Sequence, residues 1–195
     1  ALVRDEKGQK MSKSKGNVID PLELIEKYSA DALRFTLLSM ASPGRDVKLS
    51  EDRVKGYRNF LNKIWNANNF LIQNDCKFEN IETPNDLKLN INKWIFVEFT
   101  NTNEKIKKSI DSYRFDEAAR IAYQFVWHSF CDWYLELSKT VFYSENNENI
   151  EETRNVASFI FTQILVILHP FIPFLTEEIW LKNKLDKDGK DFLML

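Results

Sequence analysis

The stretch DEAARIAYQFVWHSFCDWYLELSKTVF, residues 116–142, decides the fold class. On a helical wheel, apolar side chains surround it on nearly every side. They are Ile121, Ala122, Tyr123, Phe125, Val126, Trp127, Phe130, Trp133, Tyr134, Leu135 and Leu137. The polar side chains form only a narrow seam, made of Arg120, Gln124, His128, Asp132, Glu136 and Lys139. A helix of this kind is buried among others, so the stretch predicts the central helix of a mainly α bundle, with His128 a hydrogen-bonding core residue.

Helical periodicity continues over the rest of the chain after Ser50. We expect Ser50 to cap a helix over 51–73, and a loop over 74–88 to follow it. Further helices are expected at 89–112, at 152–168 and after Pro173, with His169 at a helix end as a partner of the helix dipole. We therefore predict that residues 51–195 form an α-helical bundle.

The first fifty residues predict a smaller, mixed element. ALVR and VKL each read as a short strand. Between them, Asp20-Pro21 places an N-cap before a proline at the first helical position, and Ser29 caps a second helix in which Asp31 suits the positive end of the dipole. Residues 1–50 are thus expected to form a β-α-α-β connector.

Composition narrows the class of protein. The chain has 195 residues, of which 44% are hydrophobic and 13% aromatic, enough for a real core. We predict no signal peptide and no membrane span, because no apolar run approaches about 18–20 residues. Cys76 and Cys131 lack metal-ligand spacing, which favours a reducing cytoplasmic setting and no metal site. The missing initiator methionine and the apolar DFLML ending lead us to expect a piece of a longer polypeptide.

Positive charge is concentrated in the first third, although the net charge is −2. Residues 1–19 carry five cations and two acids, a balance of +3, and residues 45–67 carry six cations and three acids, again +3. The segment 144–152 has four glutamates and no base. We therefore expect any polyanion to bind the first third of the chain.

The segment GQKMSKSKGNVIDP, residues 8–21, gathers lysines on a stretch too rich in glycine and serine for a stable helix. Lys10, Lys13 and Lys15 repel one another unless solvent or an anion lies among them. The simpler interpretation is a solvated surface loop.

The helix over 51–73 has two unlike faces. Its predicted buried stripe consists of Val54, Tyr57, Leu61, Ile64, Trp65, Asn68 and Ile72. The opposite face has no acid, and consists of Lys55, Asn59, Asn62, Lys63, Asn66 and Phe70. An exposed phenylalanine beside lysine and asparagine suits the stacking of unpaired bases. Alternatively this is a plain outer face, with Phe70 covered by a neighbour.

The lysine segment also carries a resemblance. KMSKS, Lys10 to Ser14, is identical to the signature loop of class I aminoacyl-tRNA synthetases, and KGNVIDPLELIEKYSADALRF continues through Phe35 as it does in those enzymes. Within that class, residues 39–71 and FCDWYLELSK at 130–139 resemble the valyl-tRNA synthetase family, whereas LHPFIPFLTEEIW is shared more widely. The resemblance covers essentially the whole chain and is weakest at 75–112 and 143–155.

The resemblance implies that the loop closes over ATP, with Mg²⁺ in the full-length enzyme, while valine attacks the α-phosphate. Lys10 and Lys13 would be catalytic, and the ATP-binding residues would be Lys10, Met11, Ser12, Lys13 and Ser14. Met11 would anchor a mobile loop, and Gly16 would permit its motion. Because the remaining catalytic domain and the editing domain are not in this sequence, we predict that the chain alone forms no adenylate and holds no bound cofactor.

The resemblance also implies that the bundle binds the anticodon of tRNA, valine tRNA in particular. The candidate contacts are Arg45, Arg53, Lys55, Arg58, Asn59, Lys63, Asn66 and Phe70. Arg58 lies near the edge of the buried stripe and has a structural role as its alternative. Three other interpretations stay open: an isoleucyl, leucyl or methionyl enzyme, a stand-alone RNA-binding module, and a helical bundle with no affinity for RNA.

Overall fold

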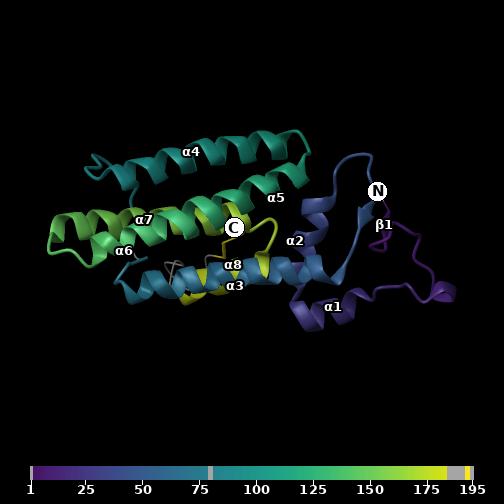
Figure 1. Cartoon of the computed structure of the whole chain (residues 1–195). Helices are drawn as coiled ribbons and strands as arrows, with labels where there is room; N and C mark the ends of the chain where they lie inside the picture. The colour runs from purple at the N-terminus through teal and green to yellow at the C-terminus, as the bar shows by residue number, and fades with distance from the viewer. Residues whose placement is uncertain (1, 79–80, 184–191, 194–195) are drawn as a thin grey trace.

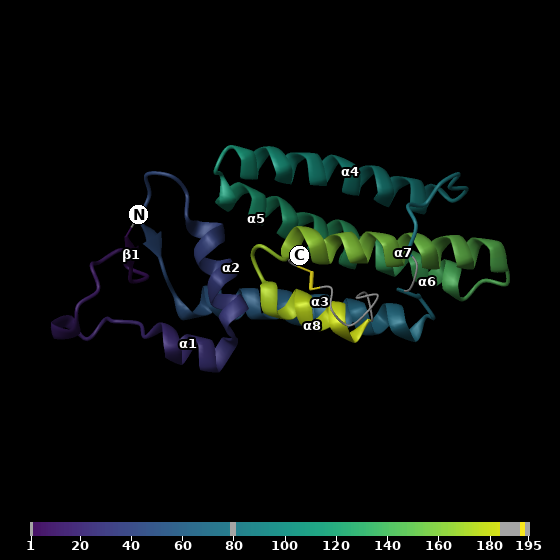
Figure 2. The same cartoon turned by 180° about the vertical axis from the view of Figure 1, so that it is seen from behind.

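The computed structural model describes residues 2–78, 81–183 and 192–193. Long helices lie side by side at one end of the molecule, and a small N-terminal element projects from the other end (Figures 1 and 2). The helices of this bundle are α3 (Glu51–Gln73), α4 (Asn90–Asp111), α5 (Phe115–Gln124), α6 (Leu135–Phe142), α7 (Asn147–Leu168) and α8 (Pro173–Lys182). The prediction of a mainly α bundle is confirmed.

The N-terminal element has the predicted order of strand, helix, helix and strand. Strands β1 (Val3–Arg4) and β2 (Val47–Lys48) pair in parallel, with Val3 opposite Val47. Between them lie α1 (Pro21–Tyr28) and α2 (Ala30–Met40). The predicted caps are present, since Leu22 N donates to Asp20 Oδ1 at 2.8 Å and Ala32 N donates to Ser29 Oγ at 3.3 Å.

One hydrophobic core runs from α2 into the bundle. The rings of Phe35 in α2 and Phe60 in α3 lie 5.3 Å apart, and that of Phe171, before α8, lies 6.0 Å from Phe35. All three side chains are fully buried. Asp31 adds a polar join, because its carboxylate accepts from the backbone N–H groups of Phe174 and Leu175 at the start of α8. The N-terminal element is therefore attached to the bundle through α2.

Helix α4 is held to the bundle at its N-terminal end. Glu152 of α7 accepts from the backbone N–H groups of Lys88 and Leu89 at 2.8 and 3.0 Å, and from Asn92 Nδ2 at 2.9 Å. Burial pushes the pKa of Glu152 upward, but these hydrogen bonds outweigh it and the pKa is lowered. The buried Tyr134 hydroxyl donates to Asn92 Oδ1 at 2.9 Å. These contacts give acceptors to the backbone donors of Lys88 and Leu89, directly before the first turn, and so help to fix where α4 begins.

The structure corrects the predicted central helix in one respect. Between α5 and α6 the chain forms a π-helix, η2 (Phe125–Tyr134), so the helix over 115–142 is continuous but not uniform. The wider π turn changes which side chains face inward. Trp133 is consequently 62% exposed and Leu137 39% exposed, although both were expected to be buried.

Several smaller predictions are also wrong. The seam residue His128 is exposed and not part of the core. On α3, Ile72 is 43% exposed, whereas Phe60, absent from the predicted stripe, is fully buried. Helix α7 begins five residues before the expected start, at Asn147, because Asn146 Oδ1 accepts from Asn149 N and caps it. Ser50 stands at the N-cap of α3 but makes no side-chain cap bond.

The predicted bundle segment 51–195 includes residues 79–80, 184–191 and 194–195, which lie outside the described residues. Among the helices that the structure describes, none combines the length and apolar character needed to cross a membrane.

Candidate nucleotide loop and RNA-facing surface

The lysine loop is folded against the start of the chain by two polar side chains. Asn17 Oδ1 accepts from Ser12 N at 2.9 Å, and Asn17 Nδ2 donates to Asp5 Oδ2 at 2.9 Å. Asp5 Oδ1 in turn accepts from Gln9 N at 2.7 Å. The hydrogen bond from Asn17, followed by that from Gln9, lowers the pKa of Asp5 below its usual 3.8. Asp5 is therefore ionised at neutral pH and holds both sides of the loop.

The tip of the loop is a short 3₁₀ turn, η1 (Lys13–Lys15), closed by Gly16 at φ 65°. This left-handed conformation favours glycine. Ser12 and Ser14 face each other, with their hydroxyl oxygens 3.2 Å apart. Met11 is partly buried against the hydrophobic core, in the place expected of an anchor.

The lysines of the loop remain open to a ligand. Lys10, Lys13 and Lys15 are all exposed. None of the three forms an ion pair with any described residue, so their charge is not neutralised within this part of the chain. The loop is thus a preformed turn that presents ammonium groups to solvent, and whether ATP meets them stays a prediction.

Arg45 lies in a different turn, between α2 and β2. Gly44 there has φ 74°, and Arg45 N donates to Ser42 O at 3.2 Å. The neighbouring Asp46 accepts from Leu2 N at 2.9 Å and pairs with Arg4, which closes the strand pair. The Arg45 side chain is exposed.

The predicted RNA-contacting residues of α3 fall into two groups, those with exposed side chains and those with half-buried ones. The exposed members are Arg53, Lys55, Arg58, Asn59 and Asn66. The structural alternative for Arg58 is not supported, because its side chain faces solvent. The other two members, Lys63 and Phe70, are half-buried.

Lys63 and Phe70 contact the central helix. Lys63 pairs with Asp132 of η2 and lies 4.2 Å from the centre of the Trp127 ring. The Phe70 ring lies 6.2 Å from that of Phe142, with Lys139 Nζ 5.6 Å from its centre. The prediction of an exposed Phe70 is therefore wrong, and the alternative of a ring covered by a neighbour is partly correct, since Phe142 of α6 packs against it.

Asp132 connects α3 to the outer side of η2. Its Oδ1 pairs with Lys63, and its Oδ2 lies 3.2 Å from His128 Nδ1. The hydrogen bond from Lys63 is the main reason that the pKa of Asp132 is lowered. Side chains from helices far apart in sequence thus form one polar track across the bundle surface.

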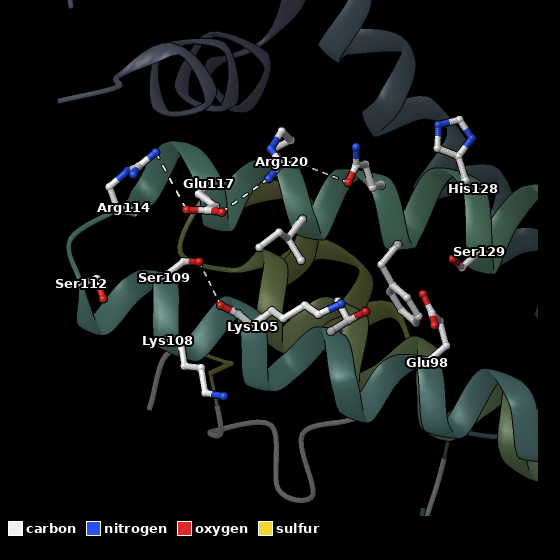
Figure 3. Close-up of a pocket in the computed structure, with 14 residues that line it drawn as sticks. Glu98, Lys105, Lys108, Ser109, Ser112, Arg114, Glu117, Arg120, His128 and Ser129 are labelled. Carbon is white, nitrogen blue, oxygen red and sulfur yellow. Dashed lines mark hydrogen bonds and ion pairs between the residues drawn. The ribbon is translucent and has the colours of Figure 1, made fainter. Parts of the chain in front are cut away.

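Sequence reasoning missed a groove on the other side of this track, between α4 and α5 (Figure 3). Its volume is about 820 Å³, and residues from both helices and from the start of η2 line it. Its lining includes four cations, namely Lys105, Lys108, Arg114 and Arg120. The run NEKIKKSIDSYR, residues 103–114, was the available signal, with two of these lysines three positions apart.

Within the described residues, no group of three His, Cys, Asp or Glu side chains is arranged to hold a metal ion. Cys76 and Cys131 are free and buried, and burial raises the pKa of each thiol to about 12. Neither cysteine is therefore a reactive thiolate near neutral pH.

Comparison with known proteins finds similarity to parts of tRNA ligases. A family model described as the anticodon-binding domain of tRNA ligase matches residues 92–195. A second, described as tRNA synthetases class I (I, L, M and V), matches residues 1–50. A valine–tRNA ligase from Pelagibacter ubique is 71% identical over 195 residues, and one from Agrobacterium fabrum is 50% identical over 194 residues. Each alignment covers 100% of this chain, which spans 22% and 20% of those relatives, about a fifth of their length.

Solved structures show the same fold at low sequence identity. The Agrobacterium radiobacter LeuRS–tRNA–LeuAMS ternary complex aligns with a TM-score of 0.71 at 20% identity, over 93% of this chain and 21% of that one. Mycobacterium tuberculosis methionyl-tRNA synthetase with methionyl-adenylate also has a TM-score of 0.71, at 18% identity, over 91% of this chain and 36% of that one.

Proposed function

The chain belongs to the family of anticodon-binding domains of tRNA ligases, and we propose that it is the part of a valine–tRNA ligase that supplies the ATP loop and binds tRNA. The observation that carries this proposal is the 71% identity to a valine–tRNA ligase along the entire chain. Residues 1–50 are the end of the catalytic region with a stem-contact element, and residues 51–195 are the anticodon-binding bundle. The match of the class I family model to residues 1–50 supports this division.

In the proposed activation step, a carboxylate oxygen of valine forms a bond to the α-phosphorus of ATP. The bond between that phosphorus and the oxygen bridging to the β-phosphate breaks, and pyrophosphate leaves. Negative charge grows on the phosphate oxygens during this exchange, and preorganised cations stabilise it. Lys10 and Lys13 supply that charge, while Met11, Ser12 and Ser14 hold the loop that carries them. The exposure of both lysines, and the lack of an ion pair between either of them and any described residue, support the assignment.

Magnesium is expected to accompany ATP in the full-length enzyme. The described part of the sequence has no carboxylate cluster of the kind that holds a metal. The described residues thus show no built site for that ion.

In the proposed tRNA complex, the exposed side of α3 faces the RNA. Arg53, Lys55 and Arg58 contact phosphates, which positions the RNA without reading its sequence. Asn59 and Asn66 donate and accept hydrogen bonds at base edges. The part of the Phe70 ring that α6 leaves open stacks on a base. Arg45 and Lys63 are the remaining proposed tRNA contacts. Lys63 binds the RNA either after its ion pair with Asp132 breaks or through the ammonium hydrogens that Asp132 does not engage.

The proposed partners are valine tRNA and the remaining catalytic and editing domains of the same polypeptide. The proposed compartment is the cytoplasm, where charged tRNA is consumed. Two free, buried cysteines are compatible with a reducing environment.

Binding of valine tRNA, compared with a transcript that differs only in its anticodon, tests the proposal. The full-length polypeptide containing this chain should bind the valine anticodon more tightly, and affinity for both transcripts should fall steeply as salt is raised. Equal affinity for both anticodons at every salt concentration would refute recognition of the valine anticodon.

A further inference from the structure

The groove between α4 and α5 contains none of the proposed tRNA contacts. It forms where a tight turn joins the two helices. The two helices run antiparallel and are joined at residues 112–114, where Tyr113 has φ 57° and Arg114 N donates to Ser109 O at 2.8 Å. Figure 3 shows side chains from both helices along the groove. The turn therefore brings the basic end of α4 beside the first turns of α5.

The charge of the groove is positive, and two of its cations have no ion-pair partner among the described residues. Its lining holds four cations against Glu98 and Glu117, a net charge of +2. Arg114 is engaged by Asp116 at 3.1 Å, and Arg120 lies 3.6 Å from Glu117. Lys105 and Lys108 form no ion pair with any residue that the structure describes. A pair of uncompensated ammonium groups thus lies three positions apart on one face of α4.

Hydroxyl groups accompany these cations. Thr102, Ser109, Ser112 and Ser129 all line the groove. Ser109 Oγ donates to Lys105 O at 2.9 Å, whereas the hydroxyls of Ser112 and Ser129 make no hydrogen bond within the described chain. Lysine beside serine and threonine is the set of side chains that contacts phosphate and sugar oxygens in nucleic-acid complexes.

The groove is connected to the α3 surface through residues already described. His128 lines the groove and also pairs with Asp132, which holds Lys63 of α3. The helix formed by α5, η2 and α6 lies between α3 and α4, so both surfaces flank it (Figure 1). An RNA strand placed on α3 can therefore reach the groove without crossing the bundle.

We propose that the groove between α4 and α5 binds the phosphodiester backbone of RNA, as a second contact beside the α3 surface. This proposal rests on the proposed tRNA function and adds a site to it. Lys105 and Lys108 supply the charge, and the serine hydroxyls supply additional donors. Because the contacts are to the backbone, they add affinity and salt dependence but do not read the anticodon.

The test compares two double variants of the full-length polypeptide that remove the same charge. Lys105→Gln/Lys108→Gln removes two positive charges from the lining of the groove. Lys93→Gln/Lys107→Gln is the control, because it removes two positive charges from exposed lysines of α4 that do not line the groove. Affinity for valine tRNA and for its anticodon-altered version is measured across a salt series. A third variant, Lys105→Arg/Lys108→Arg, keeps the charge.

We expect the groove variant to bind both transcripts on the order of tenfold more weakly at low salt, with its salt slope reduced by about 1.4 for two single-strand phosphate contacts. Preference for the valine anticodon should remain, the control double variant should bind like the parent, and the arginine variant should restore binding. Equal losses in both glutamine variants, or no loss in either, would overturn the groove site.

Two further outcomes separate the possible causes. If the unmodified polypeptide shows no preference for the valine anticodon, the proposed function is refuted. The groove is then still tested by comparing the affinities of the variants for RNA. A poly-glutamate peptide that binds the parent but not the groove variant, with RNA binding unaffected, would assign the groove to an acidic protein and overturn the RNA proposal.

Discussion

Different kinds of contact stabilise the N-terminal element and the helical bundle of this chain. Around the lysine loop the contacts are polar, and the carboxylates of the buried Asp5 and the exposed Asp46 accept hydrogen bonds from backbone and side-chain donors. In the bundle the contacts are apolar, with fully buried rings such as those of Phe60, Phe130 and Phe161. Polar surface contacts can open locally at little cost, whereas a packed aromatic core unfolds as a unit. The difference fits the proposed function, in which the loop closes on ATP beside a frame that holds its shape.

Replacing a core ring should have the largest effect on the bundle. Phe60 is fully buried, and its ring lies 5.3 Å from Phe35 and 4.8 Å from Tyr123. Phe60→Ala is expected to lower the free energy of unfolding by about 3–5 kcal/mol, because it leaves a cavity that the neighbours only partly fill. Chemical denaturation measures the change.

Phe174→Ala is the matched control, because that ring is 67% exposed. Its effect should stay within about 0.5 kcal/mol. Similar losses in the two variants would contradict the view that the bundle depends on its buried aromatic core.

The join between the two regions should give an intermediate effect. Asp31 is 2% exposed, and it accepts from Leu175 N at 2.7 Å and Phe174 N at 3.4 Å. Asp31→Ala leaves these donors of α8 without an acceptor, which is expected to cost about 1–3 kcal/mol in the free energy of unfolding. Asp31→Asn keeps an acceptor and should lose less.

The same residue gives a pH dependence of known sign. Burial raises the pKa of Asp31 above 3.8, although the two backbone hydrogen bonds oppose the shift. The folded state therefore holds this proton to higher pH than the unfolded state does. The stability of the parent relative to Asp31→Asn should fall as pH rises from about 3.8 through the raised pKa. A difference that grows with pH in this window would contradict the assignment.

The smallest effect on global stability is expected in the lysine loop. Asp5→Asn weakens the bonds to Asn17 and to Gln9 N, so amide hydrogen exchange should accelerate at residues 9–17 while the denaturation midpoint barely changes. Glu6→Gln is the control, because Glu6 is exposed and makes no such contact. Global unfolding of Asp5→Asn, in step with its loop, would show that the two regions are not independent.

Sequence reasoning recovered what local chemistry determines. Asp20-Pro21 and Ser29 marked real helix starts, and the periodicity after Ser50 gave the correct fold class. It failed where a neighbour decides the outcome. Phe60 is buried because α2 and η2 supply rings on either side, and Trp133 is exposed because a π-helix shifts the inward face, which a wheel of constant period cannot represent.

The candidate site shows the same division. The lysine loop was recognisable from five adjacent residues, since a loop motif is local in sequence. The groove was not, because Lys105 and Arg120 are fifteen positions apart and meet only when α4 and α5 pack antiparallel. Charge counts along the chain placed polyanion binding in the first third. They did not predict the cations of the groove, because these come together only in the folded chain.

Amino-acid activation by a variant with both loop cations neutralised tests the central claim most directly. In the full-length polypeptide, Lys10→Gln/Lys13→Gln should lower the rate of valine-dependent pyrophosphate exchange by at least about 100- to 1,000-fold, the usual cost of removing one such donor. Lys15→Gln, the exposed control in the same loop, should change that rate far less, and tRNA affinity should be unchanged in both variants. An undiminished exchange rate in the double variant would contradict the account.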